Sequence, residues 1–193
     1  MPDFNTAGPQ RSFDVIPANT VATLQITVRP GHAGDGGWLR RSKDGSSEGL
    51  DLEFTVVHGE HAKRKFWALL TLSGTTDGHA EAARISQSKI RAMLESARGV
   101  RPDDMSEVAV KARWIADYGE LNNLRFIGRI GVQPPQNGYK AKNVLDEVIT
   151  PDRTDWQAIE QVAFEQAAEE SAATAAKPSA SAPAKIERPA WAS

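Results

Sequence analysis

The order in which the apolar residues change their spacing constrains the fold of this chain more than any other feature. Three early segments and two late ones have the apolar pattern of β-strands. Between the two groups lies a segment with the 3.6-residue period of an amphipathic helix. The strand-like segments are 20–29, 50–59, 64–74, 124–133 and 143–150, and the helical segment is 75–99. The sequence therefore predicts a mainly β fold with a helix between the third and fourth strands.

This order of elements is that of an OB-fold, a five-stranded Greek-key barrel with its helix between strands three and four. An OB-fold binds oligonucleotides or oligosaccharides through the face of strands 2–3 and the loops that join strands 1–2 and 4–5. In this chain those loops would be residues 30–49, with a short hairpin near 38–41, and residues 134–142. Because the middle of segment 64–74 is apolar at consecutive positions, we predict a central strand with little solvent on either face.

The ends of the helical segment carry local signals. Thr76 or Asp77 can accept hydrogen bonds from the first backbone N–H groups of a helix, and Gly99 suits the left-handed residue that often ends one. Residues 102–123 predict a second, weaker helix, although residues 108–112 would also suit a strand.

The charge of the chain separates a body from a tail. Residues 1–150 contain 19 Lys and Arg against 18 Asp and Glu, a balance of +1, whereas residues 151–193 contain 4 against 7, a balance of −3. A nearly neutral body can still bind nucleic acid if its cations converge on one face. We predict an OB-like nucleic-acid-binding domain over 1–150, an acidic C-terminal helix over 151–172, and a disordered tail rich in Pro, Ala and Ser over 173–193.

The two predicted binding loops are also the loops in which cations accompany aromatic rings. Single-stranded nucleic acid is held by cations along its phosphates and by rings that stack on its bases. The candidate binding residues in these loops are Trp38, Arg40, Arg41, Lys43, Tyr139, Lys140 and Lys142. The set also includes the basic run Lys63, Arg64 and Lys65, at the turn into the third strand, and Arg129 in the fourth strand.

Each of these residues also has a simpler structural interpretation. Loop cations are often only solvated charges, and the run 63–65 can serve merely to keep a turn in water. Trp38 either packs back onto the barrel or stacks on a base, and we favour stacking. The other large aromatic residues are expected to pack: Trp67 in the core or against the helix, with a stacking platform as its alternative, Trp114 and Phe126 in the core, and Trp156 and Phe164 where the tail helix docks or a second subunit binds.

The sequence gives little support to catalytic or metal chemistry. The absence of cysteine excludes disulfides, thiolate catalysis and cysteine-ligated zinc. His58 and His61 have the spacing of metal ligands, but with only His79 nearby we read them as exposed turn residues. Converging carboxylates, a phosphate-binding P-loop and a Ser-His-acid triad are not legible either. We therefore expect a protein that is not an enzyme and that uses no cofactor or metal.

Three stretches of the chain resemble a family of phage and prophage proteins of unknown function. They read FDVIPANTVATLQI at 13–26, GLDLEFTVVHGEHAKRKFWALLTL at 49–72 and LRFIGRIGVQPPQNGYKAKNVLDEVITP at 124–151. Their motifs are an apolar segment that leads to Ile-Pro, a glycine-ended strand before a basic turn, and a hairpin that ends in Lys142-Asn143. Members of the family are encoded among phage recombination and replication genes. The resemblance therefore implies a single-stranded DNA-binding role, without catalytic residues.

Together these features predict a single-stranded DNA-binding protein with little sequence preference, acting in phage DNA replication or recombination. The alternative is a non-catalytic adaptor whose C-terminal tail engages a phage recombinase, polymerase or helicase. No stretch approaches the roughly 20 apolar residues of a membrane span, and the N-terminus lacks the apolar run of a signal peptide. We expect a location in the host bacterial cytoplasm, no membrane contact, and an oligomeric state that the sequence leaves open.

Overall fold

The computed structural model describes residues 5, 6, 8 and 14–159, which form one antiparallel sheet of seven strands and a few helices. The strands are β1 (Thr20–Arg29), β2 (His32–Ala33), β3 (Leu39–Arg41), β4 (Ser47–Val56), β5 (Lys65–Gly74), β6 (Arg125–Gln133) and β7 (Lys142–Ile149). The helices are α1 (Asp77–Arg98), α2 (Glu107–Ala112) and the 3₁₀ turns η1 (Asp35–Gly37) and η2 (Tyr118–Leu121), and residues 154–159 are also helical. The predicted mainly β fold, with its helix between the third and fourth long strands, is confirmed.

The five long strands lie in the order β5-β4-β1-β6-β7, and β2 and β3 extend the sheet beside β4. β4 pairs with β3 through its first residues and with β1 through the rest, and β5 lies on its other edge. β5 and β7 contact each other, but no hydrogen-bonded ladder joins them in the described part of the chain. The sheet is therefore not closed into the predicted barrel.

A segment that precedes the first strand explains part of this opening, because it links the starts of β5 and β7. The backbone N–H of Ile16 donates to Oδ1 of Asn143 at 2.8 Å, and Nδ2 of Asn143 donates back to the Ile16 carbonyl at 2.8 Å. The guanidinium of Arg64, next to β5, donates to the carbonyl of Asp14. Ile16 is only 1% exposed, so its side chain fills the core at this place. The Ile-Pro and Lys-Asn motifs of the family resemblance are thus hydrogen-bonded to each other, although Ile16 and Asn143 are 127 positions apart in the sequence.

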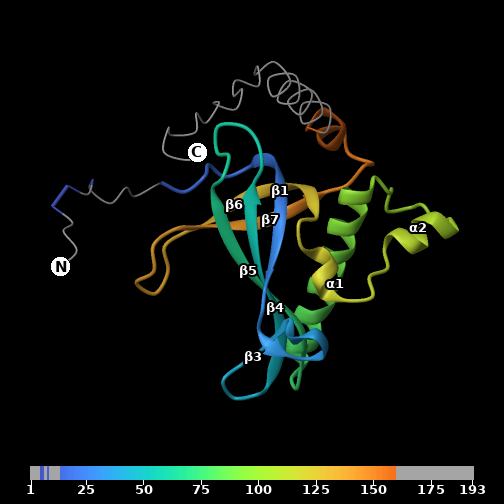
Figure 1. Ribbon diagram of the computed structural model, residues 1–193, viewed down its shortest axis with the longest axis horizontal. Helices are drawn as coiled ribbons and strands as arrows, with labels where there is room; N and C mark the ends of the chain where they lie inside the picture. Colours follow the sequence, from blue (N-terminus) through green and yellow to red (C-terminus); the bar gives the residue numbers. More distant parts are fainter. Residues whose placement is uncertain (1–4, 7, 9–13, 160–193) are drawn as a thin grey trace, which may run out of the picture.

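The core follows from the alternation of the long strands. Leu24 and Ile26 of β1 and Phe54 of β4 have no exposed surface. The ring of Phe54 lies 5.3 Å from that of Phe66 and 5.8 Å from that of Phe126, measured between ring centroids. Phe126 was predicted to be a core residue, and this is confirmed. Helix α1 packs against β5, β6 and β7 and leaves the other side of β4 and β5 uncovered (Figure 1).

Both predicted ends of α1 are confirmed. The side-chain oxygen of Thr76 accepts a hydrogen bond from the backbone N–H of His79 at 3.2 Å, and Gly99 ends the helix with φ +65°. Near this end, α1 carries the buried Glu95. Its carboxylate accepts a hydrogen bond from Nε of Arg113, beyond the helix, at 2.6 Å. Arg113 also donates to the carbonyl of Asp104 at 2.7 Å, so one guanidinium fastens the segment 100–114 onto α1.

Two predictions about aromatic burial are wrong. Trp114, expected in the core, is 68% exposed just after α2, because this short helix buries only Ala109. Trp67, expected to pack, is 51% exposed, and its neighbour Leu69 is 58% exposed. The predicted central position of this strand is wrong for the same reason: β5 pairs with β4 alone among the described strands, and its outer side faces solvent.

Candidate nucleic-acid interface

The β6–β7 hairpin, residues 133–142, carries its tip on a tight turn. Asn137 and Gly138 both have positive φ values, 52° and 79°, as a two-residue hairpin turn requires. Backbone hydrogen bonds between Gln136 and Tyr139, at 3.0 and 3.2 Å, close the turn on both sides. This geometry places Tyr139 at the tip, where its side chain is 78% exposed.

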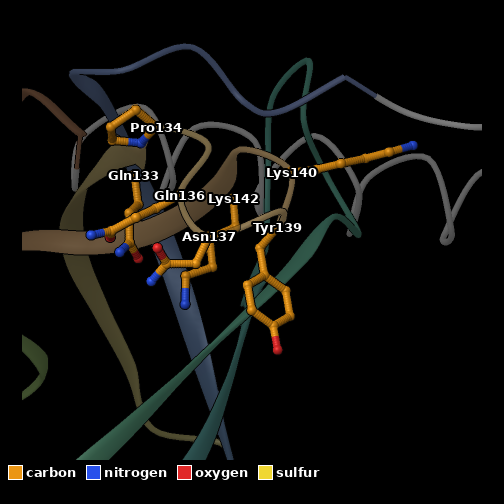
Figure 2. Close-up of a pocket in the computed structure, with 7 residues that line it drawn as sticks. All are labelled: Gln133, Pro134, Gln136, Asn137, Tyr139, Lys140 and Lys142. Carbon is orange, nitrogen blue, oxygen red and sulfur yellow. The ribbon is translucent and has the colours of Figure 1, made fainter.

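The hairpin cations are directed into solvent. Lys140 and Lys142 are exposed, and neither forms an ion pair within the described residues. Figure 2 shows the ring of Tyr139 and the side chain of Lys140 extending in different directions from the same loop. A hollow of about 260 Å³ lies beside them, lined by Gln133, Pro134, Gln136, Asn137, Tyr139, Lys140 and Lys142. The hairpin can therefore reach a phosphate and a base without first breaking an ion pair.

A second surface lies on the outward side of β4 and β5, and we call it the β4–β5 face. Its members are Asp51, Glu53 and Thr55 of β4 and Lys65, Trp67 and Leu69 of β5, which alternate with the buried residues of the same strands. Glu53 stands opposite Trp67 in the register, and Asp51 stands opposite Leu69. The face thus presents a half-exposed ring and an exposed leucine beside a row of carboxylates.

One carboxylate organises the middle of this face. Oε1 of Glu53 accepts from Nζ of Lys65 at 2.6 Å, and Oε2 accepts from the indole N–H of Trp67 at 3.1 Å. The hydrogen bond from Lys65 is the main reason why the pKa of Glu53 is lowered from its usual value of 4.5. The indole is therefore held in place by its edge while its ring remains half-exposed, which suits stacking on a flat ligand.

The loop that contains β3 supplies cations to one end of the face. Arg40 donates to Asp51 at 3.1 Å, and Arg41 donates to Glu48 through two nitrogens at 2.9 and 2.7 Å. Lys43 is exposed on the following turn. A hollow of about 210 Å³ joins this loop to β5, lined by Arg40, Arg41, Ser42, Lys43, Ser47, Glu48, Gly49, Leu69 and Thr71. The structure therefore brings the predicted cations of loop 30–49 together with the outer side of β5.

The remaining predicted residues are placed differently. Trp38 is partly buried against the core, and a Cβ added at Gly119 would lie 2.6 Å from its ring, so the ring packs back onto the body. The ring of Trp38 therefore packs, which is the alternative interpretation and not the stacking that we favoured. Trp38 belongs neither to the β6–β7 hairpin nor to the β4–β5 face. Arg129 is held by Glu147 at 3.3 Å and by Asp155 at 3.1 Å, two partners that raise its pKa.

The basic run is divided by the turn between β4 and β5. Lys63 is exposed with φ +68°, Arg64 contacts Asp14, and only Lys65 lies on the β4–β5 face. In Figure 1 the β6–β7 hairpin projects to the left, whereas the loop between β3 and β4 projects from the lower end of the sheet, where the carbonyl of Ser46 accepts from Thr75 just before α1. The tips of the two predicted loops are therefore separate.

Trp67 and Leu69 were not predicted as binding residues, although a signal was available. Phe66 and Leu70 are buried, so the residues of opposite parity face outward, and Lys65 belongs to that parity. A charged residue in phase with two apolar ones marks a solvent-facing side. The signal was easy to miss because residues 66–70 are all apolar, so the alternation between buried and exposed positions does not show.

Some classes of site are absent from the part of the chain that the structure describes. It contains no group of three or more His, Asp or Glu side chains that could share a metal ion. None of its helices combines the length and the apolar character needed to cross a membrane. Residues 160–193, which include Phe164 and most of the predicted acidic helix and tail, lie outside the described residues. Comparisons with known protein families and with curated proteins find no match to this chain.

Proposed function

We propose that this protein binds single-stranded DNA without catalysing a reaction on it. The observation that carries the proposal is the exposed pair Trp67 and Leu69, with cations at its border, on a sheet surface that none of the described helices or strands covers. Each base stacked on an aromatic side chain contributes about 1–3 kcal/mol, and such stacking tolerates any base. Trp67 would stack a base, while Lys65, Arg40 and Lys43 would contact phosphates.

The order of the long strands supports the same proposal. β5-β4-β1-β6-β7, with α1 between β5 and β6, is the order of an OB-fold, and we propose an OB-like barrel that stays open between β5 and β7. In that fold the equivalents of the β4–β5 face, the β3 loop and the β6–β7 hairpin bind the ligand. Tyr139, Lys140 and Lys142 would then form a second, more adaptable contact.

A role in phage DNA replication or recombination is proposed from the family resemblance described above. Such a protein would coat unpaired strands in the host bacterial cytoplasm, with little sequence preference. Partners such as a recombinase, polymerase or helicase would be met through the C-terminal residues.

The direct test is fluorescence anisotropy with a labelled single-stranded oligonucleotide across a salt series. We expect binding that weakens as salt rises, with a log–log slope of about −0.7 for each phosphate contacted. A folded protein that leaves the anisotropy unchanged at low salt would overturn the proposal.

The second candidate function is a non-catalytic adaptor, and the surface around α2 favours it. Met105, Val108, Val110 and Trp114 are each more than half exposed, and exposed apolar groups of this kind often mark protein contacts. The double variant Val108→Ser, Trp114→Ser separates the two functions. It should preserve DNA binding if the sheet binds DNA, and it should abolish capture of a partner if the surface around α2 is the adaptor element.

A further inference from the structure

The β4–β5 face contains a feature that opposes nucleic-acid binding in its simplest form. Two carboxylates, Asp51 and Glu53, lie between its cations, and they are the more protected partners. The side chains of Asp51 and Glu53 are 14% and 17% exposed, whereas those of Arg40 and Lys65 are 61% and 49% exposed. Negative charge therefore occupies the middle of the face, and positive charge occupies its border.

This arrangement is unfavourable for a phosphate placed on the middle of the face. Arg29 and Arg40 both reach Asp51, at 3.6 and 3.1 Å, so a phosphate there must compete with a carboxylate for the same cations. Like charges brought together at an interface cost several kcal/mol and serve to reject wrong partners. A DNA duplex presents its phosphates outward and keeps its base faces stacked inside, so it cannot avoid this contact.

A single strand can avoid it by turning its bases inward. A base stacked on Trp67 would lie over the carboxylates, and its phosphates would remain at the border near Lys65 and Arg40. Carboxylates of Asp and Glu accept hydrogen bonds from exocyclic amino groups such as N4 of cytosine. The same two carboxylates would therefore repel an approaching phosphate and accept from a base.

We propose that Asp51 and Glu53 determine specificity, and that they make the β4–β5 face selective for single strands over duplex. The inference rests on the proposed function, since it assumes that this face binds DNA. It differs from a purely structural role, in which Glu53 would only position Trp67 and Lys65. Glutamine at 53 separates the two roles, because its amide oxygen can still accept from the indole while the negative charge is lost.

The experiment compares the wild type with the double variant Asp51→Asn, Glu53→Gln. Dissociation constants are measured for a single strand and for a duplex of the same length at one salt concentration. We expect the ratio of duplex to single-strand dissociation constants to fall on the order of tenfold, mainly because the duplex binds more tightly. Circular dichroism and thermal unfolding verify the fold, and the two single variants, each expected to give part of the shift, replace the double variant if it unfolds.

The matched control is Glu81→Gln, Asp103→Asn. These carboxylates pair with Arg84 at 2.6 Å and with Arg101 at 3.1 Å on exposed sites of α1 and the loop beyond it, so the control removes the same charge elsewhere. An unchanged ratio in the test variant, or an equal fall in the control, would overturn the inference. Equal binding of duplex and single strand by the wild type would overturn it while leaving the proposed function intact. A wild type that binds neither ligand would reject the proposed function itself.

Discussion

The β6–β7 hairpin and the β4–β5 face both combine an aromatic ring with cations, but they differ in what holds those groups. Lys140 and Lys142 extend from the hairpin without an ion pair among the described residues, and Tyr139 is 78% exposed. On the face, Lys65 is paired with Glu53, and the same carboxylate fixes the indole of Trp67. The hairpin is therefore an adaptable contact, and the face is a preorganised one.

This difference has a thermodynamic consequence for the proposed DNA binding. When a solvated lysine neutralises a phosphate, counterions condensed on the DNA are released, which makes binding sensitive to salt. A cation that must first leave a carboxylate gives a smaller net release, because the freed carboxylate attracts a cation in its place. We expect the hairpin to set the salt dependence, and the face to supply stacking that salt changes little.

The largest expected effect is on folding stability. It concerns Arg113, a cation that is buried in an ion pair and so stabilises the fold without being available to a ligand. Arg113 and Glu95 have side chains only 13% and 4% exposed. Removing one partner of such a buried pair costs about 3–5 kcal/mol, and we expect the low end, about 3 kcal/mol, because Arg91 also pairs with Glu95 at 2.8 Å and remains. Arg113→Met should lower the free energy of unfolding by this amount, measured by urea denaturation. Arg101→Met, which breaks an exposed pair with Asp103, should cost no more than about 1 kcal/mol. Equal losses of unfolding free energy in the two variants would show that burial does not make the Arg113 ion pair more stabilising than the Arg101 pair.

The second prediction tests the preorganised ring. Trp67→Ala should weaken single-strand binding by about 1–3 kcal/mol, because it removes one stacking platform. The slope of affinity against salt should stay the same, since no cation is lost. Trp114→Ala is the control, because Trp114 is similarly exposed but lies beside α2. A loss of affinity in the control as large as that of Trp67→Ala would place the interface elsewhere.

The third prediction tests the adaptable cations. Reversing both hairpin lysines, Lys140→Glu with Lys142→Glu, should reduce affinity about tenfold and flatten the salt slope by about 1.4, the contribution of two phosphate contacts. Anisotropy titrations at several salt concentrations measure both quantities. The same reversal at Arg84 and Arg101, on the side of α1, controls for net charge. Parallel salt lines for the hairpin variant and the wild type would contradict the division of roles.

The smallest effect concerns the turn that presents Lys43. Hydrogen bonds from Ser42 and Ser46 lower the pKa of Asp44 from 3.8 to about 2. Because the folded-state pKa is the lower one, ionised Asp44 stabilises the turn fully above pH 3.8, and this contribution is lost as the pH falls towards 2. A carbon-13 NMR titration should find the Asp44 midpoint at about 2. The variant Ser42→Ala, Ser46→Ala should raise that midpoint, and an unmoved midpoint would exclude the hydrogen bonds as its cause.

The sequence predicted the elements well because their signals are local. The apolar patterns indicated all five long strands, the third of them through a run without alternation, and Thr76 and Gly99 marked both ends of α1. The position of Trp114 depended on which surfaces other elements cover, and residue spacing does not encode coverage. The outward position of Trp67 was encoded in its spacing from Lys65, but the apolar run around it masked that signal. The failure of the sheet to close could not be read from the sequence, because the segment between β5 and β7 is held by Asn143 bonding the backbone of Ile16, a contact between distant residues that no local pattern contains.

The loops of the candidate site could be predicted from the sequence, whereas Trp67 and Leu69 were missed. Cations next to rings pointed to these loops, because exposed loop residues can be recognised as a group. The ion pairs of Arg40, Arg41 and Lys65 were not legible, since each joins residues that only the strand register brings together. For this reason the sequence could not distinguish the hairpin lysines from the cations of the face.

The clamp between Ile16 and Asn143 also affects how the protein is made. Its two residues are separated by 127 positions, and a ribosome adding about 5–20 residues per second needs roughly 6–25 s to synthesise that interval. During this time Ile16, which is 1% exposed in the finished fold, has no Asn143 to bind. Ile16 and its neighbours, which are translated before β1, are thus among the last residues to reach their final place. Until β7 emerges from the ribosome, the nascent chain exposes the apolar side chain of Ile16.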